Sequence, residues 1–301
     1  MKNIIRIATR NSPLALRQAT MVKNLLASDI NCELVPMTSS GDTFSSKRFK
    51  QHGGKGLFLK ELEESMLQGE CDIAVHSLKD VPAVVDDEFD ILTISGRENP
   101  ADVLISNKHN SISVMPENSI IGTSSPRRIA MLKNHSKEFK IVDIRGNIQT
   151  RLEKLDKQKI DGIILAAAGI HRMDLNVHIK EYLPIDKFIP SAGQGILCIE
   201  FLRKNREIRS ILSKHIIVNV QRCADIEREF VEHLEGDCMS PIGIYAMVEN
   251  KKIKIKAFVS SLDGEEHIKT TYETDAGDGG NPGKDLAKAF LKQGARRLLN
   301  R

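Results

Sequence analysis

Short apolar runs rich in β-branched residues alternate with amphipathic stretches along the first two thirds of the chain. The runs "IIRIA" (4–8) and "DIAVH" (72–76) have the length of buried strands, and "LFLKELEESML" (57–67) between them has apolar residues at helical spacing. Strands that alternate with helices are typical of sheets with helices packed on their faces. This part of the chain therefore predicts an α/β fold.

The alternation stops at "SGRENPAD" (95–102) and then starts again. Further strands are expected at "SIIGT" (119–123), "KIVDI" (140–144) and "DGIILAAAG" (161–169), with helices between them. We expect two α/β domains with a hinge near residues 95–101. From about residue 218 the pattern changes to a helix, a loop, strands and a final helix, which predicts a small α+β domain.

Polar side chains, many of them basic, follow the predicted strands. They are Arg10 and Ser12 after the first strand, Ser77, Lys79 and Asp80 after "DIAVH", then "TSSPRR" (123–128), Arg145 and Arg172. In open α/β sheets the ligand crevice lies at the carboxyl ends of the strands. Five separate connections would therefore bring polar and cationic groups to edges of this kind, which favours an anionic ligand.

The sharpest of these segments is "TSSPRR". Ser124 or Ser125 can cap a helix that begins at Pro126, so that backbone N–H groups lie beside Arg127 and Arg128. Such a helix start binds anions, and each charge-assisted hydrogen bond contributes about 1.5–3 kcal/mol. The alternative interpretation is an ordinary capped helix with two solvated arginines.

Composition narrows the classes of partner. The 301 residues carry a formal net charge of +4, from 44 basic and 40 acidic side chains, and lack Trp, so we expect no nucleic-acid partner. Because no apolar run approaches membrane-spanning length, we expect no membrane partner. Five cysteines without a CxxC pair favour neither a disulfide framework nor a zinc site, and are typical of a reducing, cytoplasmic location.

Three features have weaker interpretations. "GGKG" (53–56) lacks the Ser or Thr of a phosphate loop, so it predicts a mobile loop in which Lys55 could reach a ligand. His76 closes an apolar strand, which favours a hydrogen-bonded core histidine over a catalytic base. Cys238, taken alone, is most simply a small buried hydrophobic residue.

Five motifs together resemble one enzyme family. They are "AVHSLKDVP" (74–82), "IGTSSPRR" (121–128), "IRGNIQTRL" (144–152), "GQG" (193–195) and "LEGDCMSPIG" (234–243). In this order they resemble the hydroxymethylbilane synthase family, also called porphobilinogen deaminase, over nearly the whole chain. The resemblance implies a transferase of tetrapyrrole (porphyrin, haem) biosynthesis. It would join four porphobilinogen molecules head to tail, with loss of ammonia, into hydroxymethylbilane.

The resemblance also implies roles for individual residues. Cys238 would carry a covalent dipyrromethane primer, and Asp80 would be the catalytic carboxylate that stabilises the azafulvenium cation left when ammonia departs. The primer and growing chain would contact Ser77, Lys79, Thr123, Ser125, Arg127, Arg128 and Arg151. The incoming substrate would contact Arg10, Ser12, Gln18, Arg145 and Arg172. Lys55 and Phe58 would belong to a loop over the cleft, and no metal is implied. Without the resemblance, Asp80 would be interpreted as a turn cap.

The implied architecture is two doubly wound domains like those of type II periplasmic binding proteins, plus the small α+β domain. The first would comprise residues 1–95 with 196–213, the second 101–189, and the third, 218–301, would carry the anchoring cysteine. We expect a monomer. The chain departs from the family pattern at Asp237, where glycine is usual, and this carboxylate should disfavour the Cys238 thiolate and so limit primer loading.

The residues alone leave two other classes of function open. A non-catalytic carboxylate-binding protein of the same fold would explain the arginines, although it would give Cys238 no task and would usually carry an export signal. A pyridoxal-phosphate enzyme could use Lys79 for a Schiff base and "TSSPRR" for the phosphate. Loss of a visible absorbance band on borohydride treatment would identify the second class.

Overall fold

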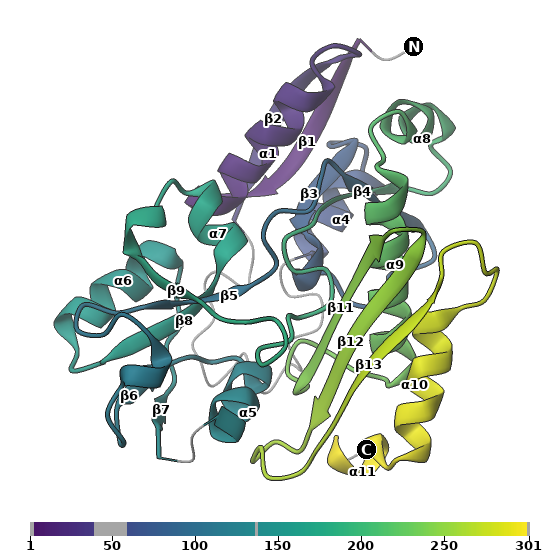
Figure 1. Cartoon of the computed structure of the whole chain (residues 1–301). Helices are drawn as coiled ribbons and strands as arrows, with labels where there is room; N and C mark the ends of the chain where they lie inside the picture. The colour runs from purple at the N-terminus through teal and green to yellow at the C-terminus, as the bar shows by residue number, and fades with distance from the viewer. Residues whose placement is uncertain (1–2, 39–58, 136–137, 300–301) are drawn as a thin grey trace. The chain divides into compact units, whose positions relative to one another are not determined.

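The computed structural model describes residues 3–38, 59–135 and 138–299 of the chain (Figure 1). The chain forms two compact units, one of Met1–Arg97 with Ile196–Arg222 and one of Glu98–Gly195 with Cys223–Arg301. Both units are discontinuous in sequence, because the chain leaves the first after Arg97 and returns to it at Ile196.

The first unit contains a five-stranded sheet. In spatial order its strands are β2 (Asn31–Met37), β1 (Ile4–Arg10), β3 (Ile73–Ser77), β10 (Leu197–Leu202) and β4 (Phe89–Ile94). Strand β1 runs parallel to β2 and β3, whereas β10 is antiparallel to β3 and β4. The carboxyl ends of β1 and β3 therefore lie at the same edge of the sheet.

Helices cover both faces of this sheet. Ile5 and Ile7 of β1 pack in one cluster with helices α1 (Pro13–Leu26) and α8 (Arg206–Ser213). Ala8 points to the opposite face, because successive strand residues alternate, and packs in a second cluster with helix α4 (Lys60–Leu67). The predicted helix at 57–67 is thus present from Lys60, and its first two positions lie outside the described residues.

The second unit contains another five-stranded sheet. Its strands, in spatial order, are β7 (Lys140–Val142), β6 (Ile120–Gly122), β8 (Gly162–Ala166), β5 (Asp102–Ile105) and β9 (Ile179–Tyr182). Strand β6 is parallel to β7 and β8, and β5 is antiparallel to β8 and β9. The order and directions match those of the first sheet, with the antiparallel strand again in fourth place.

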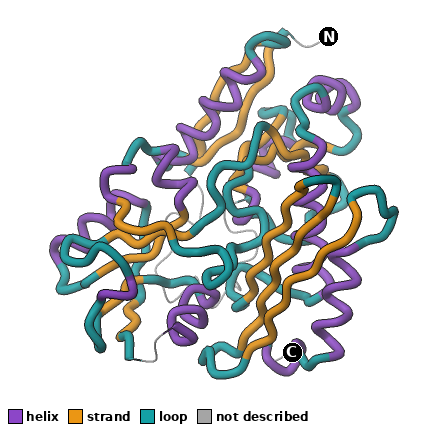
Figure 2. The backbone as a smooth tube through the Cα atoms, in the orientation of Figure 1, coloured by secondary structure: helices purple, strands orange, loops and turns teal. Residues whose placement is uncertain are grey.

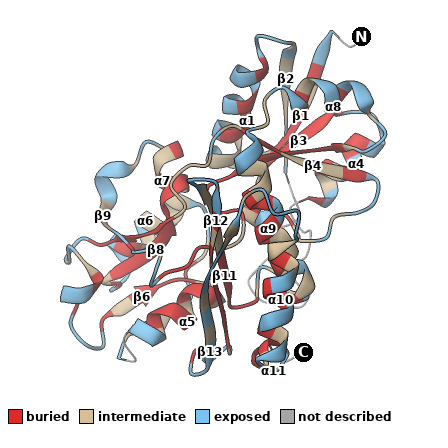
Figure 3. Cartoon of the chain, turned by 45° about the vertical axis from the view of Figure 1, so that its right-hand side comes forward, coloured by how far each residue is buried: buried red, intermediate tan, exposed pale blue. Residues whose placement is uncertain are grey.

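The helices of this second sheet also lie on both faces. Helix α5 (Pro126–His135) packs in one cluster with Ile121 and Ile164. Helices α6 (Ile148–Lys157) and α7 (Ala167–Arg172) pack in another with Ile163 and Leu165, the neighbours of Ile164 along β8. Strand β8 is buried along its whole length, as expected for a central strand covered on both faces (Figure 3).

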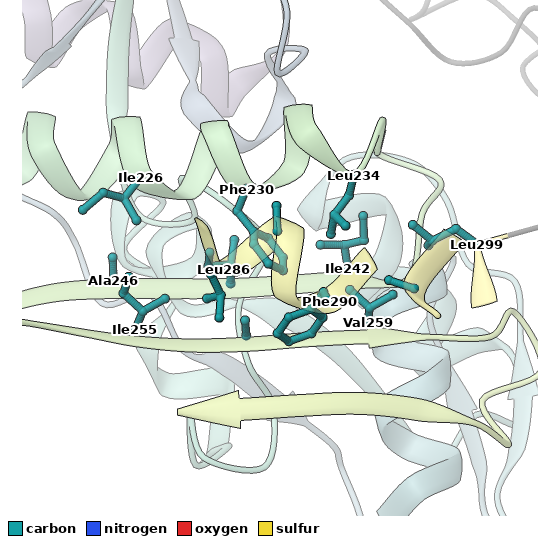
Figure 4. Close-up of a cluster of buried hydrophobic side chains, with 14 of the residues drawn as sticks. Ile226, Phe230, Leu234, Ile242, Ala246, Ile255, Val259, Leu286, Phe290 and Leu299 are labelled. Carbon is teal, nitrogen blue, oxygen red and sulfur yellow. The ribbon is translucent and has the colours of Figure 1, made fainter. Parts of the chain in front are cut away.

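The second unit also contains a three-stranded antiparallel sheet, made of β11 (Ile242–Glu249), β12 (Lys252–Ser260) and β13 (His267–Asp275) (Figure 2). Helices α9 (Val218–His233), α10 (Pro282–Lys292) and α11 (Ala295–Leu298) supply the apolar side chains that pack with it. Phe230 and Phe290 meet edge to face there, with ring centroids 5.1 Å apart (Figure 4).

The three sheets confirm the predicted fold class, namely two doubly wound α/β sheets and a small α+β part. The proposed division into three domains stays a prediction. Within the described residues, no helix is long and apolar enough to cross a membrane.

Candidate active site

A pocket lies where β1 and β3 end in the first unit. It is partly open to solvent. Its polar lining consists of Arg10, Ser12, Gln18, His76, Ser77 and Asp80. The structure therefore brings together five of the predicted site residues, which come from two separate connections of the chain.

Local structure fixes three of these side chains. Ser12 is the N-cap of α1, with Oγ accepting a hydrogen bond from the Ala15 amide at 3.4 Å, and Pro13 begins the helix. One turn later, the buried Gln18 donates from Nε2 to Ser77 Oγ at 2.8 Å. This bond joins helix α1 to the end of β3 and fixes the spacing of the two connections.

Lys79 and Asp80 follow β3 in a single turn of 3-10 helix, Leu78–Asp80. Leu78 is buried, and its amide donates to the Ile196 carbonyl at 3.0 Å, which anchors the turn to the segment before β10. Lys79 is half-buried and Asp80 is exposed. The fold thus places a carboxylate at the lining of a pocket that also contains the Arg10 guanidinium.

In the second unit, "TSSPRR" begins helix α5 as predicted. Ser125 is the N-cap: its carbonyl accepts from the Ile129 amide at 2.9 Å, and its Oγ lies 3.5 Å from the Arg128 amide nitrogen that donates to it. Thr123 is buried, with Oγ1 accepting from the Ser125 amide at 3.3 Å. Ser124 takes a different role and donates from Oγ to the Ile144 carbonyl at 2.6 Å.

Arg127 and Arg128 lie inside the second unit, with only 2% and 7% of their surface exposed. Asp102, which is fully buried at the start of β5, accepts from Arg127 Nη1 at 2.8 Å and from Arg128 Nε and Nη2 at 3.1 and 2.7 Å. Burial alone would raise the pKa of Asp102, but the charges and hydrogen bonds of both arginines outweigh burial and hold this pKa well below its usual range.

The alternative of two solvated arginines is therefore wrong, because both guanidinium groups are buried. Arg127 also donates to Ser191 Oγ and the Ile189 carbonyl, and Arg128 to the Ile164 carbonyl. Their contact with primer carboxylates stays a prediction. It would use the remaining N–H groups or exchange one of these bonds.

Two further predicted arginines, Arg145 and Arg151, lie at the turn that leads into α6. Arg151 donates from Nε to the Gly146 carbonyl at 2.8 Å, and Arg145, one residue before this glycine, contacts Asp143 at 3.2 Å. The Lys154 ammonium donates to the Arg145 carbonyl at 2.9 Å. Three cationic side chains therefore surround one turn, in which Gly146 has a positive φ of 115°.

Arg172 closes helix α7 and is almost fully buried. Its Nη2 donates to the Gly195 carbonyl at 2.8 Å, whereas its buried Nε has no hydrogen-bond partner among the described residues. Burial lowers the pKa of Arg172, and the nearby Glu98 carboxylate opposes this shift. A buried guanidinium with an unused donor is suited to a carboxylate ligand.

The "GQG" motif connects Arg172, which donates to Gly195, with the Asp102 cluster that contains Arg127 and Arg128. The sequence did not suggest this role. Gln194 donates from Nε2 to Asp102 Oδ1 at 3.0 Å and to the Pro100 carbonyl at 2.6 Å. The buried Glu227 of α9 accepts from the Gly193 amide at 2.7 Å and, through its other oxygen, from the Ala246 amide of β11 at 2.7 Å. One loop thereby joins the Asp102 cluster to the α+β part.

Cys238 is exposed on the loop between α9 and β11, so its interpretation as a buried hydrophobic residue is wrong. Asp237 Oδ1 accepts hydrogen bonds from the Met239 amide at 3.0 Å and from Ser240 Oγ at 2.7 Å. Asp237 therefore organises the turn that presents Cys238. Its expected effect on the thiolate stays a prediction.

Two predicted residues, Lys55 and Phe58, lie outside the described residues. Across the ranges that the structure does describe, no three His, Cys, Asp or Glu side chains are grouped so that they could hold a metal ion. The interpretation of His76 as a hydrogen-bonded core residue is confirmed, because it is buried and bonded to Glu200.

Two family models match the chain. The model described as "Porphobilinogen deaminase, dipyromethane cofactor binding domain" matches residues 5–210, and "Porphobilinogen deaminase, C-terminal domain" matches residues 221–292. The chain is similar to the porphobilinogen deaminases of Francisella tularensis subsp. holarctica (strain FTNF002-00 / FTA) and subsp. novicida (strain U112). Each is 41% identical over 297 residues, which is 98% of this chain and 98% of the relative.

Among solved structures, the chain is similar to the periplasmic VFT2 domain of Bordetella pertussis BvgS. The identity is 13% and the TM-score 0.44, and the likeness covers 71% of this chain and 86% of the other. A likeness at this score adds nothing to the fold assignment, which rests on the strand orders.

Proposed function

The chain belongs to the porphobilinogen deaminase family, and on this basis we propose how its residues divide the work of the reaction. The enzyme polymerises four porphobilinogen molecules into hydroxymethylbilane, with release of ammonia, in tetrapyrrole biosynthesis. This function replaces the two alternatives, the carboxylate-binding protein and the pyridoxal-phosphate enzyme. Its substrate carries two carboxylates and an aminomethyl group, so a site for it must recognise both signs of charge.

The pocket of the first unit is the observation that carries the proposal. Arg10 offers a cation, and Ser12 offers a hydroxyl, to the substrate carboxylates, and Asp80 offers a carboxylate to the aminomethyl end. Each charge-assisted hydrogen bond contributes about 1.5–3 kcal/mol, so a few suffice to hold a small dianion. Gln18 keeps Ser77 in place through its 2.8 Å bond and shapes the wall between these groups.

Asp80 is proposed as the catalytic residue. Departure of ammonia from the substrate leaves a cationic azafulvenium, and a fixed carboxylate stabilises that cation electrostatically. The same oxygen atoms can accept and return a proton, for which an exposed carboxylate at a pocket is accessible. The short helix of Leu78–Asp80, tied to Ile196, supplies the rigidity that this role requires.

Cys238 is proposed as the anchor of the dipyrromethane primer. Its exposure fits a covalent bond to a large anionic group, and Arg127, Arg128 and Arg151 of the same unit provide positive charge for the carboxylates of that group. When bound, the primer supplies the pyrrole carbon to which the first substrate is joined. Its carboxylates would be held by Ser77, Lys79, Thr123, Ser125, Arg127, Arg128 and Arg151, and those of the incoming substrate by Arg10, Ser12, Gln18, Arg145 and Arg172.

We extend the proposal to the organisation of the molecule. The three-domain division, the loop role of Lys55 and Phe58, and a monomeric state follow from family membership. A cytoplasmic location agrees with an odd number of cysteines that lack a CxxC pair.

Intact-protein mass spectrometry with peptide mapping tests the anchor. Wild type incubated with porphobilinogen should gain the mass of a dipyrromethane on the peptide that contains Cys238, and Cys238→Ser should gain none. An unmodified Cys238 after incubation with ample porphobilinogen would contradict the proposal.

The catalytic role is tested on the same material. Asp80→Asn, loaded with primer, should release ammonia and form hydroxymethylbilane about two to four powers of ten more slowly than wild type, because the charge is lost but the size is kept. Asp80→Glu should retain more activity than Asp80→Asn. Near wild-type turnover in folded, loaded Asp80→Asn would return Asp80 to the role of a turn cap.

A further inference from the structure

His76, at the lining of the substrate pocket, and Glu200 form a buried histidine–carboxylate pair. His76 lines the pocket, and its Nε2 is hydrogen-bonded to Glu200 Oε2 at 3.0 Å. Glu200 is fully buried in the centre of β10, within the run "LCIEFL". Its second oxygen, Oε1, is also buried and has no hydrogen-bond partner among the described residues. A buried carboxylate oxygen without a donor is costly, which indicates that a donor is supplied in some protonation state.

Helix α4 lies against this pair. In the register of β3 and β10, Glu200 is opposite Ala74 and Cys198 is opposite His76, so Glu200 and His76 share one face of the sheet. Ala74 packs in the cluster that contains Leu62 and Met66 of α4, so this is the face that α4 covers. Two acidic residues of α4, Glu61 and Glu63, flank Leu62, and both are partly buried. Glu63 lies close enough to Glu200 and His76 for their charges to act on it.

Glu63 has an environment that favours its neutral form. Burial and the charge of Glu200 raise the pKa of Glu63 to about 7, with a further contribution from Asp86, while His76 opposes the shift. These groups face Glu63 from three elements: Glu200 from β10, His76 from β3, and Asp86 from the loop before β4. A protonated Glu63 has an O–H group to donate, and Glu200 Oε1 is the nearby oxygen that lacks a donor.

We propose that Glu63 is a positioning residue for the reaction. Its protonated carboxyl donates to Glu200 Oε1, and this bond fixes the Glu200–His76 pair. A fixed His76 in turn holds the pocket lining that continues along the chain to Ser77 and Asp80. This inference rests on the proposed function only in taking the pocket as the substrate site. No covalent step involves Glu63, and its effect on the reaction passes through His76.

The direction of the pH dependence follows from the raised pKa. Below pH 7 the neutral form predominates and the bond to Glu200 is made. Above pH 7 Glu63 becomes anionic, loses its donor, and places a second negative charge against Glu200. If turnover requires the neutral form, activity should fall about tenfold for each pH unit above this pKa.

The pH profile of turnover in Glu63→Gln is the kinetic test. A glutamine keeps an N–H donor for Glu200 at every pH, so this variant should retain its activity between pH 7 and 8.5 where wild type loses it, with little change in KM. Glu64→Gln is the matched control, because Glu64 is on the same helix with 53% of its side chain exposed, and it should follow the wild-type profile. Superimposable profiles for Glu63→Gln and wild type would overturn the proposal.

A second measurement does not depend on activity. In protein labelled with ¹³C at glutamate carboxyl carbons, the signal absent from Glu63→Gln identifies Glu63, and this signal should titrate near pH 7 in wild type. Titration near the ordinary glutamate value of about 4.3 would overturn the inference even if the enzyme assay behaved as expected. Conversely, a titration near pH 7 with no enzymatic turnover in any variant would contradict the proposed function alone.

Discussion

Replacing Asp102 with asparagine should destabilise the second unit strongly, although Asp102 is not itself a proposed ligand contact. The carboxylate is 0% exposed and accepts four hydrogen bonds, from Arg127 Nη1, from Arg128 Nε and Nη2, and from Gln194 Nε2. An asparagine keeps one acceptor oxygen but turns an NH₂ group toward a donor. It also leaves two buried guanidinium groups without a counter-charge.

The size of the effect follows from that burial. Removing one partner of a buried ion pair costs about 3–5 kcal/mol, because the remaining charge stays in the interior. The free energy of unfolding of a domain is about 5–15 kcal/mol, so Asp102→Asn should remove a large fraction of it. With a urea dependence of about 1–3 kcal/mol per molar, the unfolding midpoint should fall by about 1 M or more.

Urea unfolding followed by circular dichroism measures this shift, and hydrogen exchange of α5 peptides assigns it to the second unit. Asp87→Asn is the matched control, since Asp87 also faces an arginine, Arg203 at 3.7 Å, but its side chain is fully exposed at 101%. The control should change stability by less than about 0.5 kcal/mol. Equal midpoints for the two variants would refute the reasoning.

The stability of the protein at acid pH provides an independent check on the role of Asp102. Its folded pKa is lower than its unfolded value of about 3.9, so the stability that it contributes is complete above that value. This contribution is lost as the pH falls toward the folded pKa. Wild type should therefore lose stability below about pH 4 more steeply than Asp102→Asn, whose amide does not titrate.

Two further predictions concern the α+β part. Gly283→Ala should unfold at a lower urea concentration than wild type, because the added Cβ would lie 2.3 Å from the Ile226 carbonyl oxygen. Overpacking of this kind costs about 1–3 kcal/mol. Gly279→Ala is the control, because a Cβ at Gly279 would have nothing within 4 Å. Asp237→Asn should raise the fraction of chains loaded with primer, measured by intact mass, because it removes the charge beside Cys238 but keeps the oxygen that accepts from Met239 and Ser240. Equal primer loading in Asp237→Asn and wild type would exclude an effect of the Asp237 charge. Asp237→Gly removes both the charge and the side-chain bonds to Met239 and Ser240, so its loading would then show the effect of the turn.

The strand and helix pattern predicted the fold class because both α/β sheets use local signals. The apolar run at residues 72–76 became most of the buried strand β3, and Pro126 became the start of α5. The run at 161–169 contains the buried strand β8 (Gly162–Ala166), but its last three residues begin helix α7. The place of β10 between β3 and β4 could not be found in this way. Its partners are more than 100 residues away in sequence, and periodicity carries no information on pairing at that distance.

The site was predictable to a similar extent. Arg10, Ser12, Ser77 and Asp80 follow strands that the pattern located, so their convergence on one pocket was within reach of sequence reasoning. Gln18 lies inside helix α1 and was predicted only through the family resemblance. The burial of Arg127 and Arg128 was not, because it depends on Asp102, which lies in another strand. A signal was nonetheless present: Asp102 and Glu200 are acidic residues at or inside apolar strand runs, and a buried acid requires a partner.

The Asp102 network also determines how variants of the proposed primer contacts must be interpreted. Arg127 and Arg128 are predicted to hold carboxylates, yet each already bonds Asp102, and Gln194 bonds Asp102 from the "GQG" loop. Gly195 of that loop accepts from Arg172, and Gly193 is held by Glu227. The desolvation of Arg127 and Arg128 is therefore compensated when the protein folds, so a ligand carboxylate meets guanidinium groups whose orientation is already fixed. A substitution at Arg128 that abolishes primer loading consequently identifies a ligand contact only when its urea midpoint remains well above that of Asp102→Asn.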